Sequence, residues 1–141
     1  MKTTLAKLIE SSSIPAELIR AVVRQSGGWK SFSESAPDIA NHGIDGGFSG
    51  FIYYRDTVAF AKRNRAAIQK MAAQQADDFG TSITEMIQGF GCYRHGTKPT
   101  DAEIGVALYE GKDDGAGVLN ALAWYAAEGV ARAFHDISER E

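Results

Sequence analysis

The chain has 141 residues, of which 44% are hydrophobic and 23% charged, and its formal net charge at pH 7 is −3. These values are ordinary for one globular domain, and a chain of this length buries enough surface to form a core without disulfides or metals. The mild negative charge argues against a general nucleic-acid coat protein. No apolar run approaches the roughly 20 residues of a membrane span, so we expect no membrane association.

The only cysteine is Cys92. A lone thiol cannot form an internal disulfide, and this usage is typical of a reducing compartment. The N-terminal apolar stretch is interrupted by Lys7 and Glu10, which argues against a signal peptide. We therefore expect a cytoplasmic protein that forms a single domain over residues 1–141.

The N-terminal third predicts two helices followed by an irregular segment. Apolar spacing indicates a short helix over residues 3–10, and Pro15 in a first turn opens a second helix that ends at Gly27 and Gly28. Residues 28–50 are rich in serine and glycine and predict only a short helical turn from Pro37 to Asn41. Residues 51–54 have strand-like composition without a partner strand, so we interpret them as an extended segment before a helix.

Helical signals continue from Asp56 to Asp78, with Asn64 as an N-cap that divides the segment. Two further helices begin at capping boxes, in which a hydroxyl and a glutamate three residues later satisfy each other's backbone donors. The boxes are Ser82 with Glu85 and Thr100 with Glu103. The second of these helices is closed by Gly111.

The last predicted helix, residues 116–137, is about 33 Å long at 1.5 Å per residue. It is apolar over most of its circumference, which is typical of a central and buried helix with Leu122 inside the core. Alternating patterns are absent from the chain. The sequence therefore predicts an all-α fold, a single compact multi-helix domain with a long central C-terminal helix.

Catalytic and metal-binding patterns are weak. Cys92 and His95, with Arg94 between them, are the one arrangement in which a base and a positive charge accompany a thiol. Residues so close along a loop seldom reach catalytic geometry, so an enzyme centred on Cys92 and His95 is kept only as an alternative. Cysteine and histidine are too scattered for a zinc site. We expect no metal, no cofactor and no enzymatic activity.

Recognition is better supported, because charge is unevenly distributed. Residues 55–70 carry a net charge of +4, and residues 113–141 carry −4. Aromatic and basic residues adjoin in the first segment, where they are typical of protein-binding hot spots and of single-strand nucleic-acid surfaces. The alternative interpretation places the aromatic residues in the core and leaves the charges as solvated helix faces. The candidate partner-binding residues are Tyr53, Tyr54, Arg55, Lys62, Arg63 and Arg65.

Four segments between residues 40 and 135 resemble a family of small proteins encoded by phage and plasmid genomes. They are GGFSGFIYYRDTVAFAKRN, ADDFG, TEMIQGF and NALAWYAAEGVARAF. The resemblance implies an accessory protein of a mobile element, a class that includes anti-CRISPR and anti-restriction proteins that act by stoichiometric binding. It carries over no catalytic residue.

The leading hypothesis is therefore a non-enzymatic, anti-CRISPR-like protein that inhibits a host defence system by binding a protein effector complex in the host cytoplasm. The acidic C-terminal helix is a second surface that such a complex could engage. A nucleic-acid-binding regulator that uses the basic residues 55–70 is the first alternative, and nucleic acid is not the favoured partner. The enzyme centred on Cys92 and His95 is the second. The sequence does not indicate an oligomeric state.

Overall fold

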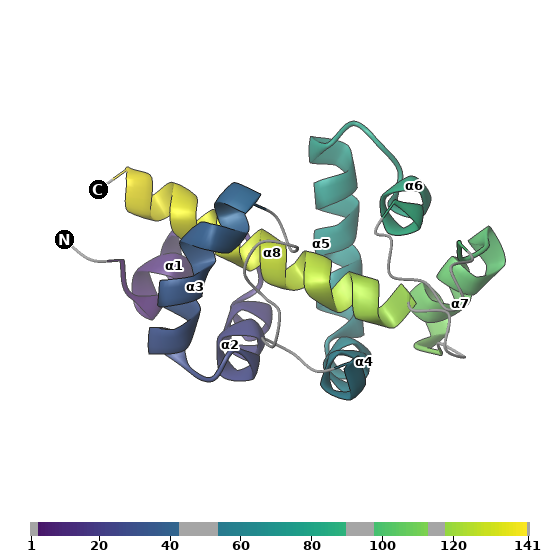
Figure 1. The fold of residues 1–141 in the computed structure, drawn as a ribbon, viewed down its shortest axis with the longest axis horizontal. Coiled ribbons are helices and arrows are strands. Elements are labelled where there is room, and N and C mark those ends of the chain that lie inside the picture. Colours follow the sequence, from purple (N-terminus) through teal and green to yellow (C-terminus); the bar gives the residue numbers. More distant parts are fainter. Residues whose placement is uncertain (1–2, 43–53, 90–97, 113–117, 141) are drawn as a thin grey trace. The chain divides into compact units, whose positions relative to one another are not determined.

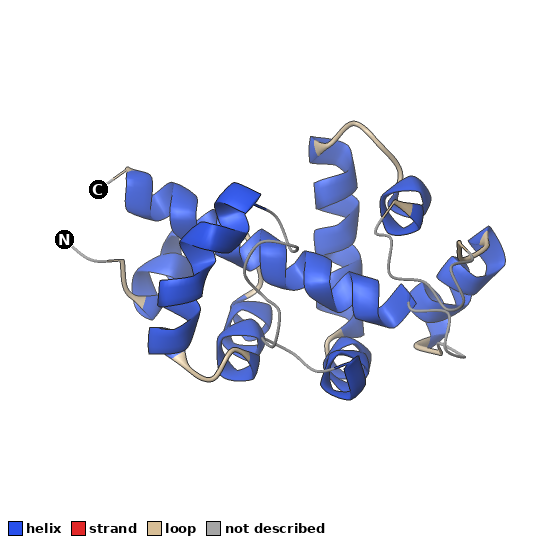
Figure 2. Ribbon diagram, viewed as in Figure 1, coloured by secondary structure: helices blue, strands red, loops and turns tan. Residues whose placement is uncertain are grey.

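The computed structural model describes residues 3–42, 54–89, 98–112 and 118–140, with the side chains of residues 41, 42, 54–57 and 120 left aside. Every secondary-structure element in these ranges is a helix, and no strand occurs in them (Figures 1 and 2). The all-α prediction is confirmed. The helices are α1 (Leu5–Ser11), α2 (Ala16–Gln25), α3 (Trp29–His42), α4 (Tyr54–Arg63), α5 (Arg65–Asp78), α6 (Ile83–Gln88), α7 (Asp101–Glu110) and α8 (Val118–Glu139).

Contacts within the chain divide it into two units. Unit 1 comprises residues 1–53 and 126–141, and unit 2 comprises residues 54–125. Helix α8 therefore contributes its first residues to unit 2 and its remaining residues to unit 1. The single domain over residues 1–141 stays a prediction.

Helix α3 in unit 1 corrects the expectation of an irregular segment after residue 28. The helix runs for 14 residues and contains Pro37, where only a single turn was expected. Phe32, Ala36 and Ile39 lie at positions i, i+4 and i+7, and all three are fully buried. Composition suggested a loop here, but this apolar spacing determines the structure, because burial of one helix face outweighs the local cost of a proline.

The core of unit 1 contains a cluster of three aromatic side chains. Phe32 lies 5.6 Å from Phe134 and Trp29 lies 5.4 Å from Phe134, both in edge-on arrangements, and the rings of Trp29 and Phe32 are 5.6 Å apart. These separations lie in the range at which aromatic pairs contribute beyond their buried area. Before this cluster, Gly27 and Gly28 both adopt positive φ and end α2 as predicted.

In unit 2, Asn64 separates α4 from α5, as the sequence predicts. The contact that its side chain makes is not the predicted N-cap. The Asn64 side chain does not cap α5. Its Nδ2 instead donates to the carbonyl oxygen of Phe60 at 2.9 Å, at the end of α4. An asparagine side chain both donates and accepts hydrogen bonds. Residue type alone therefore does not say whether it binds the first amides of the following helix or the last carbonyls of the preceding helix.

The two expected capping boxes are realised to different degrees. At α7, Thr100 Oγ1 accepts from the Glu103 amide, and Glu103 Oε1 accepts from the Thr100 amide, which completes the box. At α6, Ser82 Oγ accepts from the Glu85 amide. The Glu85 carboxylate accepts instead from the hydroxyl of Thr81, at 2.8 Å. Both predicted helix starts are confirmed.

Helix α8 has 22 residues and is the longest described helix. Its unit 2 portion buries Val118, Leu119, Ala121, Leu122 and Ala123, which confirms the prediction that Leu122 is a core residue. Tyr125 connects this portion to two other helices of unit 2. Its hydroxyl donates to the carbonyl oxygen of Met86 at 3.1 Å, and its own carbonyl accepts from Gln75 Nε2 at 3.0 Å.

No described helix is both long enough and apolar enough to cross a lipid bilayer.

Candidate functional site

Three of the six predicted partner-binding residues can be placed with their side chains. Lys62 and Arg63 end α4, Arg65 begins α5, and all three are exposed. Tyr54 and Arg55 lie in the first turn of α4, and their side chains are not described. Tyr53, like Phe51, lies outside the described residues. We call Lys62, Arg63, Asn64 and Arg65 the α4–α5 junction.

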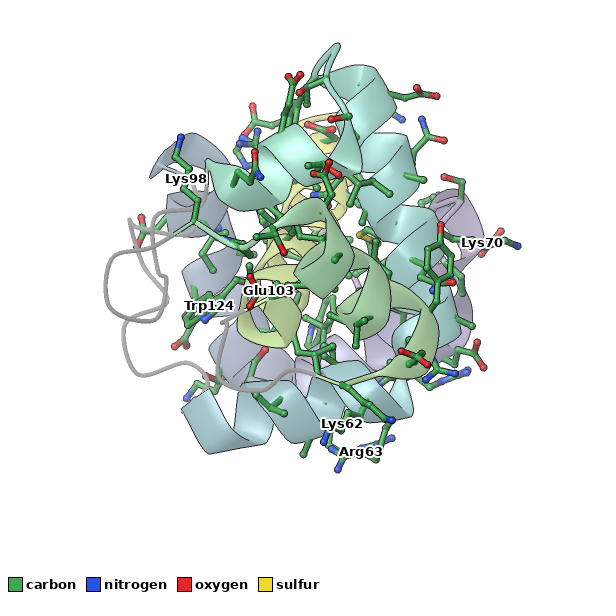
Figure 3. The ribbon with its side chains drawn as sticks, turned by 90° about the vertical axis from the view of Figure 1, so that its right-hand side faces the viewer. Lys62, Arg63, Lys70, Lys98, Glu103 and Trp124 are labelled. Atoms are coloured by element: carbon green, nitrogen blue, oxygen red, sulfur yellow. The ribbon has the colours of Figure 1, made fainter. Side chains whose placement is uncertain are left out.

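The junction separates buried aromatic surface from exposed charge. Phe60 and Ala61, which precede it, are almost completely buried. In Figure 3, Lys62 and Arg63 point outward from the end of α4, away from the ribbon. The alternative interpretation, in which the aromatic residues lie in the core and the charges are solvated, therefore holds for Phe60. Lys62, Arg63 and Arg65 remain exposed and can contact a partner.

The next contact joins α5 to the C-terminal end of α7. Gln69 Nε2 donates to the carbonyl oxygen of Leu108, in the last turn of α7. Gly111 ends that helix in the left-handed conformation, with φ of 69°. A Cβ atom on Gly111 would lie 2.8 Å from Nη1 of Arg65, so the missing side chain leaves room for the Arg65 guanidinium group. Arg65 and Gln69, one helical turn apart, thus both lie against the end of α7.

Helix α7 exposes an apolar face that the sequence prediction missed. Its buried face contains Ile104, Ala107 and Leu108. Its opposite face exposes Val106 (37%) and Tyr109 (74%), three residues apart. Ala102, four residues before Val106, is exposed on the same stripe. On a helical wheel of the residues that follow the capping box, Tyr109 lies on the side away from Ile104 and Leu108. The sequence therefore contains a signal for this second stripe.

Exposed cations continue from the junction along this part of unit 2. Lys70 lies farther along α5 and points outward in Figure 3. Lys112 follows Gly111 and is also exposed. The five cations Lys62, Arg63, Arg65, Lys70 and Lys112 form no ion pair with any carboxylate whose side chain the structure describes. The positive charge of the segment is therefore available to a partner.

The acidic C-terminal segment has less exposed negative charge than its composition suggests. Glu128 is only 5% exposed, and its carboxylate pairs with Arg132 at 2.8 Å within unit 1. The remaining described acids, Asp136 and Glu139, are exposed beside Arg132 and Arg140. In the described part of α8, one acid is buried and arginines offset the others, so the second surface expected from the acidic segment stays a prediction.

Catalytic and metal-binding candidates add little. Cys92 and His95 lie outside the described residues, so the alternative enzyme hypothesis stays untested. The described part of the chain contains no group of three or more histidine, cysteine and acidic side chains close enough to hold a metal ion.

Comparison with known proteins gives one match. Residues 11–140 match the model of a family described as a domain of unknown function, DUF7222. The chain belongs to the DUF7222 family. The match to DUF7222 includes the α4–α5 junction and the exposed face of α7. No curated protein and no solved structure matches the chain.

Proposed function

We propose that this chain is a non-enzymatic binding protein whose α4–α5 junction contacts an acidic surface of a protein partner. The observation that carries the proposal is the exposure of Lys62, Arg63 and Arg65 without ion pairs in the described part of the chain. An unpaired arginine fork is well suited to carboxylates, which it binds through two parallel hydrogen bonds. Such a cluster steers an acidic partner and orients it on contact.

The proposal extends to the partner's biological class. The resemblance of four segments to small phage and plasmid proteins leads us to propose a protein complex of a host defence system as the partner, in the host cytoplasm. Binding would inhibit that complex stoichiometrically, in the manner of anti-CRISPR proteins. Arginine and the tyrosines predicted to act with it, Tyr53 and Tyr54, are residue types that dominate protein-binding energies, and this choice of residues is the reason to propose this mode of action.

Nucleic acid is the alternative partner. A short row of cations would contact phosphates, and binding would then weaken steeply as salt rises, through counterion release. The net charge of −3 opposes association with a polyanion. We therefore expect no shift of duplex DNA or RNA by the isolated protein at low salt.

A plating assay tests the proposal. The chain is expressed in bacterial hosts that each carry one active CRISPR or restriction system, and the plating of a targeted phage is measured. We expect the chain to restore plating in at least one host. We expect Arg63→Glu with Arg65→Glu to abolish this restoration, since hot-spot losses of about 2 kcal/mol or more weaken binding by at least 30-fold.

The matched control is Arg20→Glu with Arg24→Glu, which changes the net charge equally at two exposed positions on α2. This control should inhibit defence as the unchanged chain does. Equal loss in both double variants would assign the effect to overall charge and refute the junction as the interface. Failure of the folded chain to protect phage in every host would refute the anti-defence role. Tyr53→Ala, at the other end of the predicted segment, is expected to weaken inhibition as well.

A further inference from the structure

The exposed face of α7 is a second feature of unit 2 that its own packing does not explain. Ala102, Val106 and Tyr109 lie at positions i, i+4 and i+7 and form one stripe over two turns of helix. Tyr109 is the most exposed large hydrophobic side chain among the described residues, at 74%. The buried face of the same helix already contacts the unit through Ile104 and Leu108, so the exposed stripe contributes little to folding.

One cation lies against the C-terminal end of α7, and two more directly follow residues at this contact in the sequence. The Arg65 guanidinium is placed against Gly111, two residues after Tyr109. Lys70 directly follows Gln69, whose amide group binds the Leu108 carbonyl, and Lys112 directly follows Gly111. All three cations are exposed.

The Arg65 side chain occupies an electrostatically favourable position. The C-terminal end of α7 carries the negative end of the helix dipole, which attracts a cation. The same cation lies in the first turn of its own helix, α5, where the dipole disfavours it. Contact with α7 therefore favours this position of the side chain, and a side chain already near its bound position loses less entropy on binding.

We propose that this stripe and its cations bind an acidic amphipathic helix of the protein partner. An apolar side chain of that helix covers Tyr109 and Val106, and its carboxylates contact Arg65, Lys70 and Lys112. This inference rests on the proposed function. It names the part of the same protein partner that binds the surface next to the α4–α5 junction. Side chains at i, i+4 and i+7 form one face of α7, along which the apolar face of a second helix can pack as in coiled-coil pairing.

One feature favours a helix over single-stranded nucleic acid. Stacking of successive bases requires several aromatic rings, whereas this stripe continues from its single ring onto the aliphatic side chains of Val106 and Ala102. Glu103 and Glu110 also lie on α7, seven residues apart on one stripe. The carboxylates of the bound helix must therefore be directed toward α5, where Arg65 and Lys70 lie.

The experiment measures peptide binding to the intact chain by fluorescence anisotropy. The probe is a labelled amphipathic peptide of glutamate and leucine, about four turns or roughly 15 residues long. The matched peptide replaces each glutamate with lysine, and single-stranded DNA of similar charge is the third probe. We expect the glutamate peptide to bind about tenfold more tightly than either of the others, since this difference requires at least two surface ion pairs at the upper end of their usual strength.

Variants of the chain test the geometry. Tyr109→Ala should weaken binding of the glutamate peptide by about tenfold or more, and Lys70→Glu by several-fold. Phe79→Ala is the matched control, because Phe79 is a 51% exposed aromatic side chain elsewhere in unit 2, and it should change binding less than about twofold. Circular dichroism checks that each variant remains helical.

Three results would overturn the inference: similar binding of all probes, tighter binding of DNA, or an unchanged affinity in Tyr109→Ala. Self-association of the chain that Tyr109→Ala abolishes would also overturn it, because a second copy would then cover the stripe. The plating assay separates this inference from the proposed function. If Tyr109→Ala retains inhibition that the junction variant loses, the inference fails alone, whereas peptide binding without any inhibition refutes the defence role alone.

Discussion

The two units use their aromatic residues in opposite ways. Unit 1 packs Trp29, Phe32 and Phe134 against one another, and no large hydrophobic side chain described in it is exposed. Unit 2 buries Phe60 but exposes Phe79 and Tyr109, together with Val106. Aromatic residues exposed beside unpaired cations contribute little to folding and much to binding. The difference assigns a structural role to the aromatic residues of unit 1 and a recognition role to Tyr109 of unit 2.

The contacts that hold unit 2 together support this division. Gln69, Gln75 and Tyr125 each donate from a side chain to a backbone carbonyl of another element. Gln88 likewise donates to the carbonyl of Pro99 at 3.0 Å. Hydrogen bonds of this kind hold the elements of unit 2 to one another. The outer face of α7 makes none of these four bonds.

The largest loss of stability is expected from a charge placed in the core of unit 2. Leu122→Asp buries a carboxylate without a partner, which costs several kcal/mol against a free energy of unfolding of about 5–15 kcal/mol. We expect the variant to be unfolded or to melt far below the unchanged chain, as measured by far-ultraviolet circular dichroism. Ala102→Asp, on the exposed face of α7, is the control and should melt normally. An unchanged melting temperature for Leu122→Asp would contradict the placement of α8 in the core.

A pair of aromatic truncations sharpens the comparison between the units. Phe32→Ala removes a fully buried ring and should lower the free energy of unfolding by about 3–5 kcal/mol. Tyr109→Ala removes an exposed ring and should lower it by no more than about 0.5 kcal/mol. Urea denaturation of both variants measures the two values. Similar losses would show that Tyr109 supports the fold, and its recognition role would then fail.

A smaller effect is expected at the start of α7. Thr100→Ala removes the hydroxyl that accepts from the Glu103 amide, and loss of an N-cap costs about 1 kcal/mol. The cost should appear as a reduced free energy of unfolding in the same urea titration. Ser82→Ala at α6, where only half of the box is formed, is expected to cost a similar amount or less. A clearly larger loss at α6 would show that the interaction of Glu85 with Thr81 depends on Ser82.

The smallest effect is expected at Cys92. Replacing it with serine should leave inhibition of the defence system within a few-fold of the unchanged chain, because we interpret the thiol as structural. Complete loss of inhibition in a folded Cys92→Ser variant would favour the alternative enzyme centred on Cys92 and His95. The plating assay provides the measurement.

Some of the fold followed directly from local patterns. The capping boxes at Ser82 and Thr100, the break at Asn64 and the buried face of α8 are short-range features that adjacent residues determine. Helix α3 is longer than the expected single turn because burial of Phe32, Ala36 and Ile39 outweighs the serine and proline content of the segment. Tertiary burial decides such cases, and local composition does not report it.

The candidate site was predictable only in part. Exposure of Lys62, Arg63 and Arg65 agrees with their place in a basic segment. The contact of Arg65 with Gly111 joins residues far apart in the chain, and no pattern within α5 or α7 indicates it. The exposure of Tyr109 was not predicted, although Tyr109 lies away from Ile104 and Leu108 on the helical wheel of α7.

The central claim is that the cations of the α4–α5 junction act mainly in binding a partner, and that the contact of Arg65 with the end of α7 adds only a little to stability. Measuring melting temperature and inhibition in the same Arg63→Glu, Arg65→Glu variant tests it most directly. We predict a melting temperature within a few degrees of the unchanged chain, because exposed unpaired charges contribute little to stability, together with complete loss of inhibition. Full inhibition by the folded variant would contradict the claim.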